Sequence, residues 1–390
     1  DLMGHIKGPD FPTGGIILGR SGIRSAYMIR SGFGSGSGGG SSAGTMLGDS
    51  LREAGFNVNP KTESMYLTKV GQMVEDQIAE IGMENYGSSI TSTYNAYGDA
   101  AIVTFSRTGA ENFDIATNNA VGCADEDMHG LQLNVNETAL IKHAKQHFDK
   151  VIVVINSSNI MQIPELAEPK TDGNLGVDAI LWVGSVGQDG TTALAHILNG
   201  DITPSGHTSD LWEKDFKQSP TWTNFGTNSQ NKDEDGNRMD VMYYQPDGSN
   251  TNFATVEYRE GIYYGYKYYE TRYADAQGDA AKEAAYENVL YPFGYGLSYT
   301  SFEWKLDNVE KTATIDSATQ TITMRAWVKN TGKVAGKDVV QVYYSAPYTK
   351  GGIEKAATNL VGFAKTDLLE PGESDVVTIQ FVAQDMASFD

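Results

Sequence analysis

The sequence predicts an α/β sandwich, a mostly parallel sheet with helices on both faces, followed by an all-β sandwich. Three observations support this fold class. Between residues 100 and 200, short β-branched apolar runs alternate with amphipathic stretches, a pattern typical of parallel strands joined by right-handed crossovers. Near residue 213 the composition becomes polar. Beyond residue 300 the helical pattern disappears and apolar residues alternate as they do in strands.

Four apolar runs account for the predicted parallel sheet. GGIILG (14–19) can supply its first strand, and AAIVTFS (100–106) is a short β-branched run of the kind that fills such sheets. VIVVIN (151–156) and AILWVG (179–184) are expected to be the next two strands.

Three helices are expected around these strands. TMLGDSLREAG should stop at Gly55 and GTTALAHILNG at Gly200, because glycine accepts the conformation in which helices often end. Asn134 lies three residues before Glu137 and fits the cap of the middle helix. That helix, ETALIKHAKQHFDK (137–150), places four apolar side chains on one stripe: Leu140, Ile141, Ala144 and Phe148.

The second half of the chain begins with a polar stretch. Residues 216–256 are rich in Asn, Asp, Ser, Thr and Gly, so we expect a long loop that is either functional or disordered. TQTITMRAWVKN, KDVVQVYYSAP and SDVVTIQFVAQ then alternate as strands, separated by the turns TGKVAG and EPGES. They predict a β-sandwich of about 90 residues.

Composition limits the possible functions. The formal net charge of −21 argues against nucleic acid as a partner, because phosphate contacts need a basic surface. Cys123 is the only cysteine, so no intrachain disulfide and no cysteine-based metal site can form. No apolar run approaches the roughly 20 residues of a membrane span. The chain starts at Asp1 without a visible signal peptide, so a soluble protein without a membrane partner is expected and its localisation stays open.

Four stretches carry a resemblance to a known family: FSRTGAENFD (105–114), VIVVINSSNIMQI, DAILWVGSVGQDGTTALAHILNGDITPSGHTSDLW and YREGIYYGYKYYETRY. Together they resemble glycoside hydrolase family 3, which includes many β-glucosidases and β-xylosidases. The first stretch is similar to the family pattern I-S-R-x-S-G-E-G-x-D-R. The positions in register are Phe105, Ser106, Arg107, Glu111 and Asp114. Ala110 and Asn112 replace two family glycines, and Ile115 replaces the usual arginine.

The resemblance continues to the end of the chain. YPFGYGLSYTSFEW (291–304) leads in this family into a fibronectin type III-like domain, which VKNTGKVAGKDVVQVYYSAP, LVGFAKTDLLEPGES and DMASFD resemble. The chain is therefore expected to contain an N-terminal segment (1–27), an α/β sandwich domain (28–290) and a fibronectin type III-like domain (291–390).

The family implies a retaining, exo-acting β-glycosidase that needs no cofactor or metal and acts on a β-linked glucoside or oligosaccharide. Retaining enzymes use two carboxylates about 5–5.5 Å apart, and the acid keeps its proton in desolvated or negatively charged surroundings. The resemblance makes Glu111 this acid/base residue, with a solvated loop glutamate as the alternative. It further implies that Ser35, Gly36 and Arg107 contact the sugar and that Asp114 supports the acid from behind.

The family's nucleophile is an aspartate on a separate (β/α)8 barrel, for which this sequence shows no counterpart. Ser209-Asp210-Leu211-Trp212 is superficially similar to the nucleophile motif but belongs to the PSG-x-x-x-D-x-W signature of the sandwich domain. Some family members are permuted, so we expect the first half of such an enzyme, inactive until a barrel is supplied in cis or trans. A non-catalytic carbohydrate-binding or scaffold module is the alternative.

SGFGSGSGG in the segment 31–39 contains a G-x-G-x-x-G match. A dinucleotide site would also need an acidic residue about 20 residues further on, and FNVNP (56–60) offers none. The family has a G-x-G-S-G loop, which implies a sugar-pocket loop here, because glycines let the backbone approach a ligand closely. A flexible linker is the alternative.

Residues 1–27 differ from the rest of the chain. The run GPDFPTGGIILGRSGI resembles a segment of the A-type subunit of bacterial type II topoisomerases. It lacks the strand-cleavage tyrosine, and the charge opposes DNA binding, so we expect a fused junction near residue 27 rather than a second activity.

Two further patterns have simple structural explanations. His143 and His147 lie four residues apart on a predicted helix, a spacing that can chelate a metal, but no third ligand is evident; we expect solvated neighbours on a polar face. The tyrosine-rich EYREGIYYGYKYYE can stack on sugar rings, although packing between the two domains is the favoured interpretation.

Overall fold

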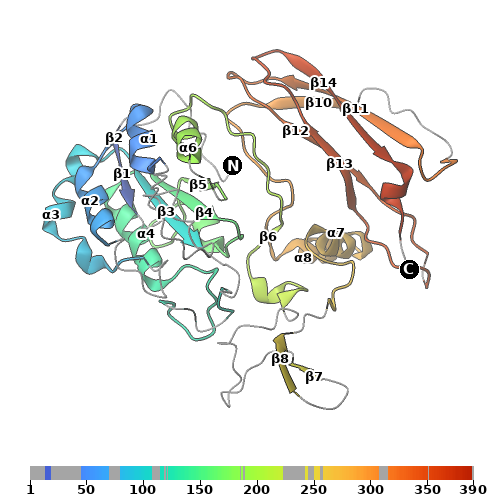
Figure 1. The fold of residues 1–390 in the computed structure, drawn as a ribbon, viewed down its shortest axis with the longest axis horizontal. Coiled ribbons are helices and arrows are strands. Elements are labelled where there is room, and N and C mark those ends of the chain that lie inside the picture. Colours follow the sequence, from blue (N-terminus) through green and yellow to red (C-terminus); the bar gives the residue numbers. More distant parts are fainter. Residues whose placement is uncertain are drawn as a thin grey trace, which may run out of the picture. The chain divides into compact units, whose positions relative to one another are not determined.

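The computed structural model describes residues 14–18, 45–69, 80–107, 115–117, 120, 122–184, 186–187, 189–222, 242–244, 250–254, 258–306, 315–349 and 351–388. Its elements are shown in Figure 1. Contacts divide the chain into two compact units, residues 1–201 with 225–256 and residues 202–224 with 257–390. The domain boundaries expected at residues 27 and 290 stay predictions.

A five-stranded parallel sheet lies at the centre of the first unit, in the order β2-β1-β3-β4-β5. Its strands are β1 Gly14–Leu18, β2 Asn57–Val58, β3 Ala101–Arg107, β4 Val151–Ser157 and β5 Ala179–Trp182. Every residue of β3 and β4 is buried, as the β-branched runs predict. The parallel sheet is confirmed, and GGIILG does supply one of its strands.

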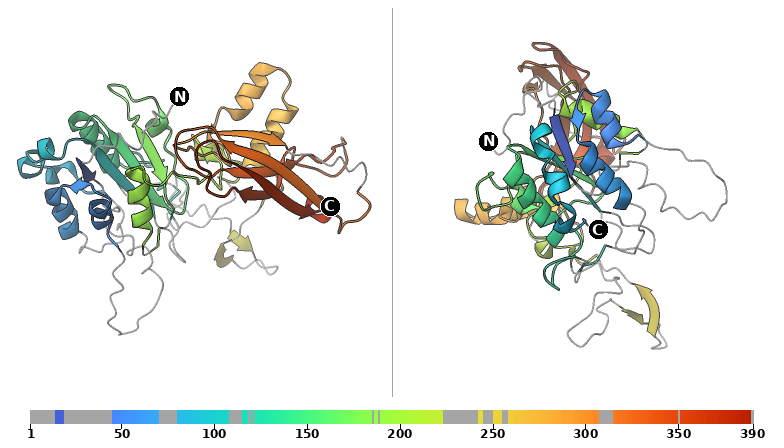
Figure 2. Two further views of the ribbon diagram at one scale, coloured as in Figure 1. Left: turned by 90° about the horizontal axis from the view of Figure 1, so that it is seen from above. Right: turned by 90° about the vertical axis from the view of Figure 1, so that its left-hand side faces the viewer.

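Helices cover both faces of this sheet (Figures 1 and 2). Helices α1 Leu47–Glu53 and α6 Gly190–Leu198 pack in one apolar cluster with Ile102 and Ile152 of the sheet. Helix α4 Val135–His147 lies on the opposite face. The predicted stripe of α4 is confirmed, because its four apolar members are all buried: Leu140, Ile141, Ala144 and Phe148.

Both predicted helix stops are glycines in the left-handed region, Gly55 with φ 95° after α1 and Gly200 with φ 86° after α6. A side chain is strained at such φ values, which explains why glycine ends these helices. The first unit also contains α2 Pro60–Lys69, η4 Met83–Asn85, α3 Ser88–Thr91, η5 Tyr94–Ala96, α5 Pro164–Ala167 and the antiparallel pair β7 Met242–Tyr244 and β8 Asn250–Ala254.

Two antiparallel sheets form most of the second unit. One has the order β10-β11-β14, with β10 Phe302–Leu306, β11 Thr321–Asn330 and β14 Ser374–Val382. The other pairs β12 Val339–Tyr344 with β13 Asn359–Lys365. Their apolar faces share one core that includes Val328, Val340 and Ile379, so the alternating pattern correctly predicts antiparallel strands around a common core.

The remaining elements of the second unit precede or follow these sheets. They are β6 Trp212–Glu213, η6 Phe216–Gln218, α7 Tyr266–Asp275, α8 Asp279–Tyr286, β9 Val289–Tyr291 and η8 Ala383–Met386, with β6 pairing antiparallel to β9. In the part of the chain that the structure describes, none of the helices combines the length and the apolar composition needed to cross a membrane.

Candidate functional site

Arg107 is the one predicted site residue that falls within the described part of the chain. Glu111, Asp114, Ser35 and Gly36 lie outside the described residues, so their roles stay predictions. The site can nevertheless be built from the residues that surround the segment 108–114.

Arg107 is the last residue of β3, at the carboxyl edge of the parallel sheet. Ligands of open α/β sheets bind outside this edge, because the loops that follow the strands meet there. The edge is fixed by contacts between strands: Ser106 Oγ donates a hydrogen bond to the carbonyl of Asn156 on β4 at 3.0 Å. This bond ties the ends of β3 and β4 together beside Arg107.

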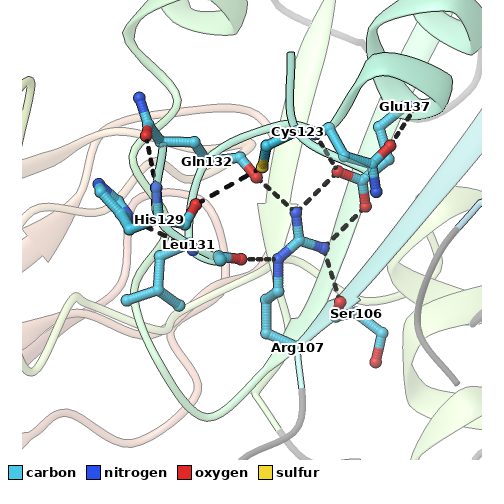
Figure 3. Close-up of polar contacts among 9 residues, drawn as sticks. Ser106, Arg107, Cys123, His129, Leu131, Gln132 and Glu137 are labelled. Carbon is cyan, nitrogen blue, oxygen red and sulfur yellow. Dashed lines mark hydrogen bonds and ion pairs between the residues drawn. The ribbon is translucent and has the colours of Figure 1, made fainter. Parts of the chain in front are cut away.

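The Arg107 guanidinium uses all of its five N–H donors within the protein (Figure 3). Nη1 and Nη2 bind the two carboxylate oxygens of Glu137, each at 2.7 Å. The other acceptors are backbone carbonyls: Gly130 at 2.5 Å, Ser106 at 2.7 Å and Gln132 at 2.7 Å. A sugar hydroxyl would have to replace one of these acceptors, so substrate contact by Arg107 stays a prediction.

Glu137 joins this arginine to the start of α4. Its Oε2 accepts the backbone N–H of Asn134 at 3.0 Å, and the Asn134 side chain accepts the N–H of Glu137 at 2.8 Å. The cap predicted at Asn134 is thus confirmed as a reciprocal capping box. Arg107 and Glu137 are both almost completely buried, with 6% and 2% of their side chains exposed, so each charge depends on the other for compensation.

Gly130 connects both ends of the segment that contains Glu111 and Asp114. Its carbonyl accepts the hydrogen bond from Arg107, which precedes the segment. Its N–H donates to the carbonyl of Ala116, which follows the segment, at 2.8 Å. A Cβ at position 130 would come within 2.7 Å of Ile115 Cγ2, so only glycine leaves room for this approach.

The loop 122–134, which contributes Gly130, is itself well ordered by hydrogen bonds. The backbone N–H of Leu131 donates to His129 Nδ1 at 3.2 Å, and Nε2 of the same ring lies 3.0 Å from Gln162 Oε1. Because Nδ1 accepts from this N–H, Nε2 is the ring nitrogen that can donate to Gln162. The His129 backbone N–H binds Gln132 Oε1 at 3.0 Å, so this buried histidine shapes the loop.

Cys123 lies beside this network, with its thiol directed at the carbonyl of His129 at 4.0 Å. Burial raises the pKa of the thiol, an effect opposed by Arg107 and reinforced by Glu137. The thiol therefore stays protonated at neutral pH and is a poor nucleophile. In the residues that the structure describes, no group of three or more His, Cys, Asp or Glu side chains is arranged to hold a metal ion.

Asn156, near the end of β4, is a buried polar residue that the sequence analysis did not single out as a site candidate. Its side chain is 7% exposed, and its Oδ1 has no hydrogen-bond partner among the described residues. A buried acceptor without a partner is unusual, and this one lies on the strand that neighbours Arg107. Only its place at the end of an apolar strand could have indicated it.

The two histidines of α4 correct one expectation. His147 is exposed, as predicted, but His143 is partly buried and its Nε2 lies 2.9 Å from the hydroxyl of Tyr94. Its ring also packs against Tyr86. Burial, together with the neighbouring His147, lowers the pKa of His143 to about 4. The expectation of two solvated rings is therefore wrong for His143, because residues 86–94 cover it.

Comparisons with known families place this geometry in context. Residues 24–266 match the model of the Glycosyl hydrolase family 3 C-terminal domain, and residues 338–390 match the Fibronectin type III-like domain. Beta-glucosidase A of Butyrivibrio fibrisolvens is 33% identical over 317 residues, 76% of this chain and 33% of that protein. A beta-glucosidase of Ruminococcus albus is 30% identical over 368 residues, 93% of this chain and 32% of that protein.

Solved structures give a consistent result. The chain is similar over its full length to a β-glucosidase from Paenibacillus barengoltzii, with 28% identity, a TM-score of 0.72 and coverage of 37% of that chain. It is also similar to β-glucosidase 3B from Thermotoga neapolitana in complex with α-D-glucose, with 28% identity, a TM-score of 0.70 and coverage of 100% of this chain and 48% of the other. The chain spans about a third of the length of the two curated relatives.

Proposed function

Because the chain belongs to glycosyl hydrolase family 3, we propose that it supplies the acid/base glutamate, Glu111, of a retaining, exo-acting β-glycosidase that hydrolyses β-linked glucosides. The nucleophilic aspartate would come from a (β/α)8 barrel outside these 390 residues, in cis or in trans. Ser35 and Gly36 are the proposed sugar contacts of the glycine-rich segment, and Asp114 the proposed support of the acid.

One observation carries this proposal: the double contact of Gly130 with Arg107 and Ala116. It connects Arg107, at the carboxyl edge of the sheet, with Ala116, and the two residues lie on either side of Glu111 in the sequence. A general acid must lie within hydrogen-bond distance of the leaving oxygen, and small displacements of catalytic groups are costly. The contact of Gly130 with residues on both sides of Glu111 therefore supports a catalytic role for this glutamate.

The proposed chemistry has two steps. Glu111 donates its proton to the glycosidic oxygen while the C1–O bond breaks and the barrel's carboxylate bonds to C1. Glu111, now ionised, then removes a proton from a water molecule whose oxygen bonds to C1, while the bond between C1 and the barrel's carboxylate breaks and the sugar is released. The 390-residue chain would contribute the proton transfers of both steps.

The test combines the full 390-residue chain with the barrel of a family member, either fused or mixed, and measures aryl β-glucoside hydrolysis. Glu111→Gln should lower kcat by roughly 10²–10⁴-fold, the usual contribution of general acid–base catalysis. Glu53→Gln is the matched control, because Glu53 is exposed at the end of α1 that is directed away from the carboxyl edge.

Two results would contradict the proposal. Hydrolysis that is restored by the barrel but unaffected by Glu111→Gln would move the acid to another residue. Turnover by the 390-residue chain alone, lost in Glu111→Gln, would show that the chain contains its own nucleophile. Sugar binding without hydrolysis in every barrel combination would instead favour a non-catalytic carbohydrate-binding module.

A further inference from the structure

The second unit contains a cavity of about 820 Å³ that the proposed glycosidase chemistry does not use. It lies between α7 and the chain that connects β12 to β13. Its volume is within the roughly 300–1,000 Å³ of small-molecule sites. Six of the lining side chains matter for its chemistry: Tyr263, Tyr268, Tyr273, Tyr348, Glu270 and Glu354. This space is called the α7 cavity below.

The two walls of the α7 cavity are joined by hydrogen bonds. The backbone N–H of Ala357 donates to Thr271 Oγ1 at 3.0 Å, and that of Leu360 donates to the hydroxyl of Tyr266 at 2.9 Å. The Tyr266 ring in turn packs against Phe293, with 4.7 Å between ring centroids. The cavity is therefore a preformed feature, which reduces the entropic cost of binding a ligand.

Aromatic side chains are the first part of its lining. Tyr348 is 55% exposed and Tyr273 is 42% exposed, although both are large and partly apolar. Two of the rings make cation–π contacts. Arg272 Cζ lies 5.3 Å from the centroid of the Tyr268 ring, and Lys282 Nζ lies 5.2 Å from the centroid of the Tyr273 ring. Tyr348 has no ring contact or hydrogen bond among the described residues, so its ring face can receive a ligand.

Carboxylates are the second part of the lining. Four line the cavity, Glu260, Glu270, Asp275 and Glu354, against two cations, Arg272 and Lys355. The Lys355 ammonium already donates to the carbonyl of Pro347 at 2.9 Å. This excess of negative charge opposes anionic ligands. Glu354 is already hydrogen-bonded to Tyr263, and Glu270 accepts from the Tyr286 hydroxyl, but a carboxylate has further lone pairs that can accept the hydroxyl hydrogens of a ligand.

Flat aromatic faces beside hydrogen-bond acceptors suit a molecule with an apolar face and a rim of hydroxyl groups. We propose that the α7 cavity is a non-catalytic binding site for a neutral oligosaccharide, with Tyr348 stacking on a sugar ring and Glu354 accepting its hydroxyl hydrogens. This inference goes beyond the proposed function and depends on it only for the choice of β-linked glucose as the first probe.

The test measures binding of cellotetraose to the full 390-residue chain by titration calorimetry. Tyr348→Ala should weaken binding about 10-fold or more, because the stacking face is lost, and Tyr348→Phe should retain it. Glu354→Gln should weaken binding several-fold. Tyr258→Ala is the matched control, since Tyr258 is 78% exposed and does not line the cavity. Urea unfolding of each variant checks that the fold is intact.

The outcomes separate this site from the proposed catalytic segment. Binding that survives Glu111→Gln but not Tyr348→Ala supports the α7 cavity even if Glu111 has no catalytic function. Binding of xylotetraose or maltotetraose in place of cellotetraose, with the same dependence on Tyr348, also supports it. The proposal is overturned if none of these sugars binds at millimolar concentration, if Tyr348→Ala has no more effect than Tyr258→Ala, or if spermidine binds in preference to every sugar.

Discussion

The buried pair of Arg107 and Glu137 makes a strong prediction about the stability of the first unit. Glu137 accepts two hydrogen bonds from Arg107 and one from the backbone of Asn134. In Glu137→Gln the arginine keeps its charge but loses its counter-charge, and the new amide NH₂ faces an N–H donor. Removing one partner of a buried ion pair costs about 3–5 kcal/mol, so we expect a loss of this size.

The assay must report on the first unit alone, because two compact units need not unfold together. Native-state hydrogen exchange, read by mass spectrometry on peptides from β3 and α4, meets this requirement. Asp49→Asn is the control: Asp49 also pairs with an arginine, Arg52, at 3.0 Å, but is 58% exposed. An exposed pair is worth about 0–1 kcal/mol. A cost of Glu137→Gln no larger than that of this control would contradict the expected loss.

The double variant Arg107→Met/Glu137→Leu separates the effect of the buried charges on stability from the effect of the hydrogen bond between Arg107 and Gly130 on activity. Replacing a whole buried ion pair by apolar residues of similar volume removes the unpaired charge. The carbonyls of Ser106, Gly130 and Gln132 lose their donor, however, so only part of the lost stability should return. Chains complemented with a barrel should therefore be slow even when they are folded. A double variant with full activity would show that the hydrogen bond from Arg107 to Gly130 is not needed for catalysis.

Three further predictions concern single side chains. Burial raises the pKa of Glu213 to about 7 from 4.5. Between these pH values the folded state keeps a proton that the unfolded state has lost, so the free energy of unfolding falls as pH rises from 4.5 to 7. Urea unfolding should show a fall of roughly 1–3 kcal/mol in the unmodified chain, which Glu213→Gln should remove. His143, whose pKa is lowered to about 4 from 6.5, has the opposite effect. Between these pH values the unfolded state binds a proton that the folded state does not, so the free energy of unfolding falls as pH drops from 6.5 to 4. His143→Gln should make this fall smaller by ~1 kcal/mol. Gly130→Ala, whose Cβ would meet Ile115 at 2.7 Å, should cost ~1–3 kcal/mol in hydrogen exchange and lower the complemented activity.

Each of these has a clear contrary result. Unchanged pH profiles in Glu213→Gln or His143→Gln would mean that the respective group titrates alike in the folded and unfolded chains. A Gly130→Ala chain with normal stability and activity would mean that the segment 115–117 can move away without consequence.

Local patterns in the sequence predict most of the fold. The buried strands β3 and β4 follow from their β-branched runs, and the α4 cap follows from the spacing of Asn134 and Glu137. These features depend on residues a few positions apart, where periodicity and capping rules apply directly. The helix stops at Gly55 and Gly200 are local in the same sense.

Contacts between distant residues could not be predicted in this way. Arg107 and Glu137 are 30 positions apart, and nothing in either local pattern indicates that they pair. The resemblance suggests a sugar contact for Arg107, whereas the structure uses its donors to hold the loop 122–134. His143 was misjudged for a related reason, because Tyr86 and Tyr94, which cover it, belong to short turns with little periodicity.

The contacts of Gly130 also involve a position at which the sequence departs from the family pattern. Ile115 replaces the usual arginine of that pattern, which weakens the resemblance of the segment around Glu111. In the structure Ile115 occupies the space that a Cβ of Gly130 would need, and Gly130 binds Ala116 directly. An arginine at position 115 would need a polar partner in this place, whereas Ile115 lies beside the glycine that binds both Arg107 and Ala116.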